Sequence, residues 1–508
     1  MEDPPIGNNI GNAGDLFRSE TWDDVVCSNL VTQFRSRFCQ ILNLSSFFAV
    51  VAVQAALIAY RCKPIVCTLI PVSLLLLYLA IHYYYFSRPV PVYIVDFSCL
   101  RPKQSYRVPL AGFVENATLL RIFDPKSVSF MADVIRVSGP GEETYLPPSL
   151  RYIPPRTQHG ECIKEAELLY FPVMDSLLAK THLSPLHIDV LIVNCSGFGP
   201  SPSLTSMIVH RYKMRDDVKT FNLSGMGCSA GGIGIDLARN ILQNRGRNKC
   251  SYAVVLSGEI LSTGWYSGKD RRKLLLNCLF RMGSSAVLVT NRDEGPKQSS
   301  NYKYKISRVF RTNRSFDDKA YLCGFRSEDD EGITGFSIER TWPEAAAETL
   351  RANVSVLAGS LLPHSEIAKY ALSLIRKKLF INPSAEAVYV PSFSSVIQHY
   401  CIPVSGLPVI KRLGKGLKLR REEMEPAAMS LHRFGNQSAA SMWYEMAYME
   451  AKGKVKKGDR IWQLWIGTGT KCCSIIWECL RDMEEDEFKR GPWFDCIHRY
   501  PIEITGFE

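Results

Sequence analysis

The feature that most constrains the fold is a glycine-rich segment around one cysteine, where an extended run gives way to a helical pattern. The segment 221–234 reads FNLSGMGCSAGGIG and places Cys228 among small residues. Its glycines predict a tight turn and close approach of a substrate. Because apolar residues recur at helical spacing over 233–242, we expect Cys228 at a helix N-terminus, where the helix dipole favours the thiolate. A small buried cysteine on a turn is the alternative interpretation.

Strand-like runs on either side of this segment indicate the fold class. Apolar runs at 188–194 and 252–258 precede and follow the Cys228 helix. A strand, a turn, a helix and a second strand in succession form an α/β layered unit. The other expected elements are strands at 91–97, 284–290 and 461–466 and a mostly helical connector over about 341–380. At 508 residues the chain is long enough for two hydrophobic cores.

Two apolar stretches precede this α/β body. Residues 41–60 and 65–86 each approach the roughly 20 residues that cross a bilayer as a helix. Because only 61–64 separates them, we expect a transmembrane helical hairpin. The excess of Lys and Arg outside its loop places both termini in the cytosol. A buried core hairpin is the alternative. The polar tail of residues 1–40 lacks a signal-peptide pattern, so we expect no cleaved leader.

The amino-acid composition limits the kinds of ligand and partner that we expect the chain to bind. The chain has 61 Lys and Arg against 50 Asp and Glu, a net charge of +11 that suits an anionic membrane surface or a phosphorylated substrate. No zinc-finger spacing or basic motif interleaved with aromatic residues is present, so we expect neither a metal site nor nucleic-acid binding. The 16 cysteines follow no regular spacing, which is typical of a reducing compartment.

Longer motifs allow the chain to be compared with a family. They are VDFS (95–98), GEETYLP (141–147), PSLTSMIV (202–209), NLSGMGCSAG (222–231), CLFRMG (278–283), DDKAY (317–321) and MSLHRFGN (429–436). Through these segments the chain resembles the plant membrane-bound 3-ketoacyl-CoA synthases of very-long-chain fatty acid elongation, which are thiolase-like condensing enzymes.

The resemblance implies a fold and a domain organisation. The fold is a thiolase-like αβαβα layered fold from two related halves, preceded by the transmembrane hairpin of residues 41–86. The expected regions are an N-terminal condensing-enzyme region over 87–378, a 3-oxoacyl-synthase-III-like region over 390–480 and a C-terminal tail over 481–508.

The resemblance also implies a reaction and its partners. An acyl group moves from acyl-CoA onto the cysteine, malonyl-CoA decarboxylates, and its enolate attacks the thioester to release 3-ketoacyl-CoA and CoA. No cofactor is implied beyond these two substrates. The implied location is the endoplasmic-reticulum membrane. The implied partners are the ketoacyl-CoA reductase, hydroxyacyl-CoA dehydratase and enoyl-CoA reductase of an elongase complex, and other 3-ketoacyl-CoA synthases, in homo- or heterodimers.

The site of this family is a Cys-His-Asn constellation, in which His and Asn donate hydrogen bonds to the enolate oxygen. Cys228 matches the nucleophile, and Asn436, at the end of HRFGN, matches the asparagine. The family histidine lies in a CIHAGG motif, but this chain reads CIPVSG, so Pro403 stands at the catalytic His position. Two more family positions differ, since Asn313 replaces a His and Cys473 an Asn. We expect these three departures to act together at the active site.

These residues are compatible with two functions. One is an active condensing enzyme, in which His399 or His432 supplies the missing donor, although both match family positions other than the catalytic one. The other is a catalytically impaired homologue that is acylated on Cys228 and binds and regulates other elongase condensing enzymes. Because the scaffold and the nucleophile are intact, the synthase is the principal hypothesis.

Overall fold

The structure is a computed structural model that describes residues 52–56, 60, 64–82, 90–244, 250–292, 302–379, 391–484, 487 and 490–504. The chain divides into two compact units, Met1–Pro89 and Val90–Glu508. In the first unit, α2 (Pro64–His82) covers most of the second apolar stretch. The tail of residues 1–40 and most of the first apolar stretch lie outside the described residues. None of the helices in the described ranges is long and apolar enough to cross a membrane.

The second unit is built on a mixed sheet of nine strands in the order β3-β2-β4-β5-β1-β6-β11-β10-β9. A separate hairpin consists of β7 and β8. The strands are β1 (Tyr93–Cys99), β2 (Ile188–Asn194), β3 (Lys219–Leu223), β4 (Tyr252–Gly258), β5 (Ser284–Thr290), β6 (Tyr304–Asn313), β7 (Gly324–Glu328), β8 (Thr334–Ile338), β9 (His399–Cys401), β10 (Arg460–Gly467) and β11 (Lys471–Cys479).

The strand order repeats. In the first half, β1 pairs antiparallel with β5, β5 antiparallel with β4, and β4 parallel with β2. In the second half, β6 pairs antiparallel with β11, β11 antiparallel with β10, and β10 parallel with β9. An antiparallel contact between β1 and β6 joins the two halves. Four strands of each half therefore share one order and one set of directions, as expected for related halves.

Helices cover both faces of these strands. The described helices of the second unit are α3 (Leu110–Leu119), α4 (Pro125–Ser138), α5 (His159–Thr181), α6 (Leu204–Tyr212), α7 (Ala230–Asn244), α8 (Leu261–Gly264), α9 (Arg271–Leu279), α10 (Asp318–Leu322), α11 (Trp342–Leu361), α12 (His364–Leu379), α13 (Leu407–Leu417), α14 (Arg421–Phe434) and α15 (Ser441–Ala451).

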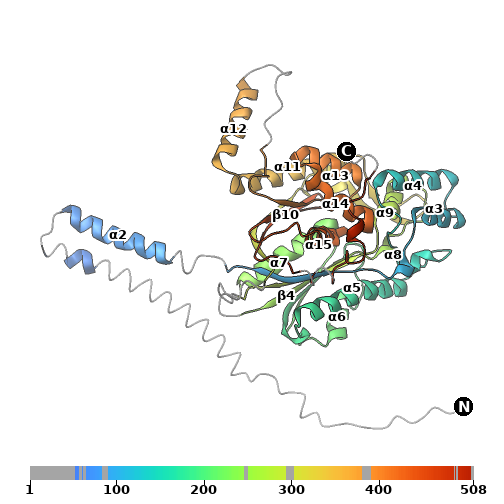
Figure 1. The fold of residues 1–508 in the computed structure, drawn as a ribbon, viewed down its shortest axis with the longest axis horizontal. Coiled ribbons are helices and arrows are strands. Elements are labelled where there is room, and N and C mark those ends of the chain that lie inside the picture. Colours follow the sequence, from blue (N-terminus) through green and yellow to red (C-terminus); the bar gives the residue numbers. More distant parts are fainter. Residues whose placement is uncertain are drawn as a thin grey trace, which may run out of the picture. The chain divides into compact units, whose positions relative to one another are not determined.

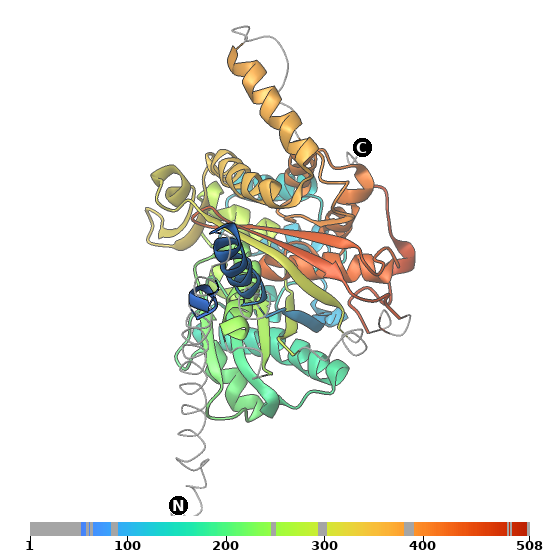
Figure 2. The ribbon, with the colours of Figure 1, turned by 90° about the vertical axis from the view of Figure 1, so that its left-hand side faces the viewer.

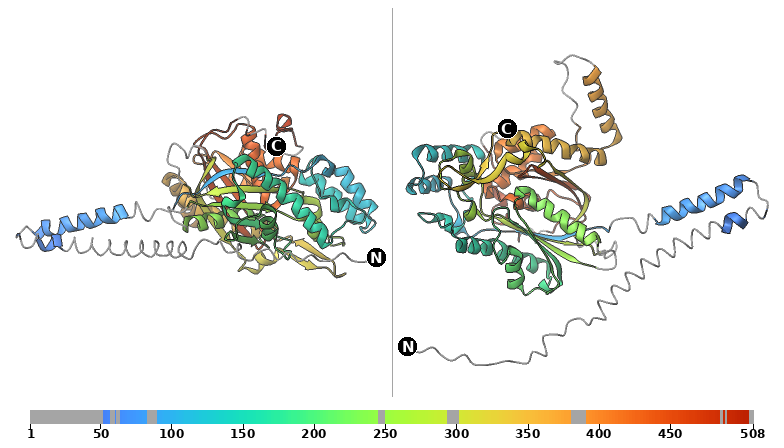
Figure 3. Two further views of the ribbon diagram at one scale, coloured as in Figure 1. Left: turned by 90° about the horizontal axis from the view of Figure 1, so that it is seen from below. Right: turned by 180° about the vertical axis from the view of Figure 1, so that it is seen from behind.

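The contacts of four helices define the layers. α5 packs on β1 and β5, whereas α11 packs on β6 and β11. Between the two sets of strands, α7 contacts β2 and β4 as well as β10 and β11, and α15 contacts β1, β9 and β10. Figure 1 shows α7 and α15 in this inner position, and the view from behind in Figure 3 shows α7 there again. α12 extends away from the strands (Figure 2). The unit is therefore a mixed, layered α/β fold.

The strands predicted most accurately are those buried on both faces. The predicted runs at 188–194, 252–258 and 284–290 coincide with β2, β4 and β5, which are buried along almost their whole length. Such strands read as continuous apolar runs. β1 starts two residues later than predicted, at Tyr93, after a proline that cannot donate to a ladder. The three-residue β9 and the half-exposed β3 give no comparable signal.

The glycines around Cys228 serve two different purposes. Gly225 and Gly227 have φ angles of 66° and 58°, so they form the turn, as predicted. Gly231 and Gly232 lie inside α7 and allow close packing instead. A Cβ at Gly231 would lie 2.3 Å from the Ala439 carbonyl oxygen, and one at Gly232 would lie 2.8 Å from the Trp465 ring. The prediction that all of these glycines shape the turn is therefore wrong for the last two.

The substitution Gly231→Ala is expected to destabilise the protein by about 1–3 kcal/mol, because the added methyl meets a backbone oxygen that cannot move without shifting the chain. The matched control is Gly359→Ala, a helical glycine of α11 whose Cβ would meet nothing within 4 Å. That change is expected to be neutral or to stabilise by up to about 1 kcal/mol. Urea unfolding of the detergent-solubilised chain measures both, and equal stabilities would contradict the packing argument.

Candidate active site

A cavity of about 580 Å³ opens where the two halves meet. The first half contributes the Cys228 turn and the residues that follow β4, whereas the second half contributes Asn436, Ser438 and the turn between β10 and β11. The two residues that were predicted as catalytic and match the family, Cys228 and Asn436, therefore line one cavity. The volume lies within the range of small-molecule sites.

Cys228 lies on a short turn that leads directly into a helix. The 3-10 turn Gly227–Ser229 precedes α7, so the predicted helix N-terminus is confirmed. The turn between β10 and β11 packs against it so closely that a Cβ at Gly467 would lie 2.3 Å from the Met226 carbonyl oxygen. Thr468 Oγ1 also donates to the Gly225 carbonyl at 3.1 Å. The second half thus fixes the nucleophile turn of the first.

The electrostatics of Cys228 differ from the sequence-based expectation. Burial is the main cause that raises the pKa of its thiol to about 11; the hydrogen bond from Ser438 acts in the opposite direction, and the negative charge of a Glu259 carboxylate acts in the same direction as burial. The sequence predicted that the helix terminus favours the thiolate, whereas desolvation of the thiol raises its pKa and favours the protonated form. Nucleophilic attack by Cys228 requires that its proton be removed.

Asn436 and Ser438 form the facing wall. The Asn436 carbonyl oxygen accepts from the Arg281 N–H at 2.8 Å, and Asn436 Oδ1 accepts from the Ser438 N–H at 2.8 Å. The amide nitrogen of Asn436 is therefore the end of the side chain that can donate to a substrate oxygen. Ser438 Oγ donates to Cys228 Sγ at 3.5 Å. Ser438 was not predicted from the sequence, although it lies two residues after a predicted catalytic position.

The structure does not bring either candidate histidine to the cavity. His399 Nε2 contacts Asp459 Oδ2 at 2.9 Å, and His399 lies opposite Ile461 at the start of β10. The Cys228 turn lies at the other end of β10, six residues away, or about 20 Å at roughly 3.3 Å per residue. His432 Nδ1 is 3.2 Å from the Tyr500 hydroxyl, and burial lowers the pKa of His432. Among the described residues that line the cavity there is no histidine.

The three departures from the family pattern are not grouped around the cavity. Pro403 is buried, and Ser405, two residues further on, lines the cavity. Cys473 is fully buried beneath α7, where a Cβ at Gly232 would lie 3.0 Å from its Sγ. Asn313 is exposed at the end of β6 and accepts a hydrogen bond from the Ser315 hydroxyl at 2.7 Å. None of Pro403, Asn313 and Cys473 lines the cavity, so the structure does not support a joint role of the three at its surface.

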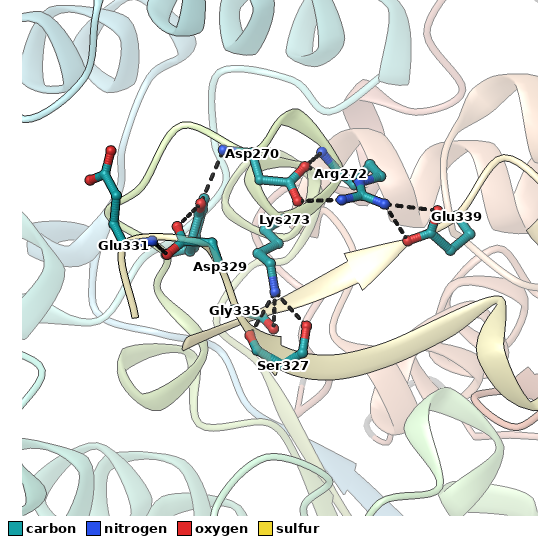
Figure 4. Close-up of polar contacts among 9 residues, drawn as sticks. Asp270, Arg272, Lys273, Ser327, Asp329, Glu331, Gly335 and Glu339 are labelled. Carbon is teal, nitrogen blue, oxygen red and sulfur yellow. Dashed lines mark hydrogen bonds and ion pairs between the residues drawn. The ribbon is translucent and has the colours of Figure 1, made fainter. Parts of the chain in front are cut away.

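The β7–β8 hairpin forms one wall of the cavity, which the sequence did not predict. Buried Lys273 of α9 anchors it by donating from Nζ to the Ser327 carbonyl at 2.6 Å, to the Ser327 hydroxyl at 2.8 Å and to the Gly335 carbonyl at 3.4 Å. Arg272 bridges Asp270 and Glu339, both within 3.0 Å, at the foot of the hairpin. Figure 4 shows these contacts between α9 and the hairpin. The wall is therefore held by a polar network outside the cavity.

Inside the cavity the same wall is apolar. α9 contributes three leucines, and the hairpin contributes aromatic and aliphatic side chains. These residues are Leu275, Leu276, Leu279, Phe325, Phe336 and Ile338. The site therefore combines a cysteine and polar groups at the junction of the halves with an apolar arm that is lined by residues of α9 and of the hairpin.

Comparison with known proteins agrees with this arrangement. Residues 84–379 match the family model described as FAE1/Type III polyketide synthase-like protein, and residues 394–479 match 3-Oxoacyl-[acyl-carrier-protein (ACP)] synthase III C terminal. The chain is 44% identical over 421 residues to 3-ketoacyl-CoA synthase 6 of Arabidopsis thaliana. The aligned residues cover 83% of each chain. It is 43% identical to 3-ketoacyl-CoA synthase 4 of the same plant, over 83% of this chain and 80% of that one.

Solved structures support the fold alone. A fungal type III polyketide synthase, ORAS, superposes with a TM-score of 0.59 at 16% identity, over 76% of this chain and 99% of that one. The 1,3,6,8-tetrahydroxynaphthalene synthase of Streptomyces coelicolor A3(2) gives a TM-score of 0.56 at 16% identity, over 76% and 99%. Together with the two family models, the fold places the chain among the thiolase-like synthases. Within that class, the chain belongs to the 3-ketoacyl-CoA synthase family.

Proposed function

We propose that the chain is a 3-ketoacyl-CoA synthase that condenses a long-chain acyl-CoA with malonyl-CoA in very-long-chain fatty acid elongation. The single observation that carries the proposal is the cavity in which Cys228, Ser438 and Asn436 adjoin an apolar arm. An acyl chain needs an apolar arm, its thioester needs a nucleophile, and an enolate needs a hydrogen-bond donor. All three lie within one cavity.

The proposed reaction has two stages. The Cys228 thiolate attacks the acyl-CoA carbonyl, the bond to the CoA sulfur breaks, and the acyl group is held as a thioester on Cys228. Malonyl-CoA then loses carbon dioxide, and Asn436 donates a hydrogen bond to the enolate oxygen. The enolate carbon attacks the thioester, which returns the cysteine and releases a 3-ketoacyl-CoA two carbons longer.

The comparisons do not favour the alternative of an impaired regulatory homologue, because the related chains are named as synthases. The proposal is tested by expressing the chain in a host that lacks very-long-chain elongation and profiling its acyl chains. Chains longer than those of the host are expected with the wild type and not with Cys228→Ala. An unchanged profile at matched protein levels would count against the proposal.

We also propose that the protein is anchored in the endoplasmic-reticulum membrane by the apolar stretches 41–60 and 65–86. Their length, the short loop between them and the Lys and Arg outside it support this anchor. The proposed partners are the reductase and dehydratase subunits of an elongase and other synthases of the family, as homo- or heterodimers.

Both termini are expected to face the cytosol, because a two-helix hairpin returns the chain to its starting side and the excess of Lys and Arg outside the loop favours the cytosol for that side. The measurement uses sealed microsomes that carry the protein with a tag at either end. Added protease should remove both tags, while a lumenal marker protein stays intact. Protection of the C-terminal tag in intact vesicles, with cleavage after detergent, would refute this topology.

A further inference from the structure

Ser438 makes a direct hydrogen bond to the nucleophile of the cavity. Its hydroxyl donates to Cys228 Sγ at 3.5 Å, and both residues line the cavity. Ser438 is 3% exposed, so little water competes for this contact. A serine hydroxyl has one O–H group, and here that group is directed at the sulfur. Ser438 is therefore placed to act on the sulfur whenever the sulfur carries negative charge.

The backbone of Ser438 has a conformation that favours glycine. Its φ angle is 55°, and Asn436 Oδ1 accepts the Ser438 N–H at 2.8 Å. Residues other than glycine cost energy in this region of φ, and they often occur at functional sites. A glycine would form the same backbone without that cost. The turn therefore does not need a serine for its backbone, whereas the hydrogen bond to Cys228 does need the hydroxyl.

Close packing of the backbone fixes the distance between the hydroxyl and the sulfur. The 3-10 turn Ser438–Ala440 contacts the 3-10 turn Gly227–Ser229, which carries the nucleophile. Gly231, in the first turn of α7, lies so close that a Cβ there would be 2.3 Å from the Ala439 carbonyl oxygen. Both ends of the hydrogen bond are therefore held by packed backbone.

A hydrogen bond to sulfur becomes stronger when the sulfur is charged. Burial raises the pKa of the Cys228 thiol to about 11, and the hydrogen bond from Ser438 acts in the opposite direction. Pro403 has no N–H, and none of the described residues that line the cavity is a histidine. The Ser438 hydroxyl is thus a donor that favours the reactive form of the nucleophile.

We propose that Ser438 is a catalytic residue that stabilises the Cys228 thiolate by a hydrogen bond, both when the sulfur attacks acyl-CoA and when it leaves the acyl group in condensation. The proposal rests on the synthase function above. Ser438 keeps its own proton throughout. In acylation the thiol proton passes to water, the sulfur bonds to the acyl carbon, and the departing CoA sulfur takes up a proton in return. In condensation the bond between the acyl carbon and Cys228 Sγ breaks, and its electron pair returns to the sulfur.

The test measures two reactions of Cys228 in the detergent-solubilised full chain. One is alkylation by iodoacetamide, read from the peptide that contains Cys228, and the other is single-turnover acyl transfer from a long-chain acyl-CoA. In Ser438→Gly, alkylation at about pH 7.5 should slow about 3–10-fold, because the thiolate is rarer without its donor although it is also more nucleophilic. The maximal rate of acyl transfer should fall by a similar factor, at an unchanged acyl-CoA concentration for the half-maximal rate.

Stability separates the effect of the hydroxyl from that of the backbone. Because glycine adopts a positive φ more readily than alanine, Ser438→Gly should unfold at a higher urea concentration than Ser438→Ala. Both variants lack the hydroxyl, so both should be alkylated equally slowly. A residue that only supports the turn would instead give reactivities that follow the stabilities.

Two controls accompany these variants. Exposed Cys250 serves as an internal reference, because its alkylation in the same samples should not change. Lys213→Gly places a glycine at another positive φ, 47°, at the exposed end of α6. This variant should carry out both reactions at the wild-type rates.

An alkylation rate of wild-type size in Ser438→Gly, or slowing confined to Ser438→Ala, would overturn the proposal, because the hydroxyl would then be dispensable. A higher acyl-CoA concentration for the half-maximal rate, at an unchanged maximal rate, would overturn it as well and assign Ser438 to substrate binding. If the wild type is alkylated on Cys228 but forms no acyl-enzyme, the proposed synthase function fails. The alkylation rates of the variants then still decide whether Ser438 stabilises the thiolate.

Discussion

Replacing Cys228 with alanine is expected to abolish transfer of a long-chain acyl group from acyl-CoA to the protein. The thiol is the nucleophilic group of the cavity, and its neighbour Ser438 provides a hydroxyl that already donates to it. We expect labelling by a radiolabelled acyl-CoA to fall by more than about 10³-fold, because loss of a nucleophile is not compensated by the remaining binding groups. Hydroxylamine should release the label from the wild type, as expected for a thioester.

The matched control for this experiment is Cys250→Ala. Cys250 is exposed and does not line the cavity, so its removal should leave the labelling unchanged. Equal labelling of wild type and Cys228→Ala would remove Cys228 from the mechanism. A loss of labelling in Cys250→Ala instead would show that an accessible surface thiol had been acylated.

The substitution Pro403→His is expected to speed condensation relative to acylation. A proline there offers neither a titratable group nor an N–H, so Asn436 is the remaining side-chain donor of the family constellation. Loss of one such donor typically costs about 10²–10³ in rate. The measurement loads Cys228 with acyl groups, adds malonyl-CoA and follows 3-ketoacyl-CoA release, so that acylation and condensation are separated. We expect Pro403→His to recover much of that factor while acylation changes little.

The triple variant Pro403→His, Asn313→His, Cys473→Asn is expected to gain little more than Pro403→His. Cys473 is buried beneath α7, and Asn313 contacts Ser315 at the end of β6. Pro403 differs from both because it lies two residues before Ser405, which lines the cavity. A triple variant far more active than the single one would restore the earlier hypothesis that the three departures form one unit. An inactive but folded Pro403→His would show that the position does not reach the enolate.

Sequence reasoning was most accurate where one physical cause controls the pattern. β2, β4 and β5 are continuous apolar runs because both of their faces are buried, and Cys228 precedes a helix because Gly225 and Gly227 form the turn before it. The pairing of β1 with β6, which joins the halves, depends on residues far apart in the chain. A pattern among neighbouring residues does not predict a pairing between strands that lie far apart in the chain.

The sequence was sufficient to predict two residues of the site, but not the pKa of the thiol. Cys228 and Asn436 were found by motif, and both line the cavity. The raised pKa of the thiol could not be predicted, because it comes from burial between segments more than 200 residues apart. Glu259 carried a weak signal, an acidic residue directly after a buried strand. His399 was considered as a donor because it lies four residues before Pro403, but β9 pairs with the start of β10, at the end of that strand away from the Cys228 turn.

A condensation assay on microsomes that contain the chain shows whether it is a condensing enzyme with Cys228 as its nucleophile. Long-chain acyl-CoA and radiolabelled malonyl-CoA are supplied, and the labelled 3-ketoacyl-CoA is measured for wild type and Cys228→Ala. The account predicts a product two carbons longer from the wild type, slower than from a histidine-bearing homologue, and none above background from the variant. Acyl-enzyme on Cys228 with no condensation product above that background would contradict the account and identify the chain as an acylated, non-condensing homologue.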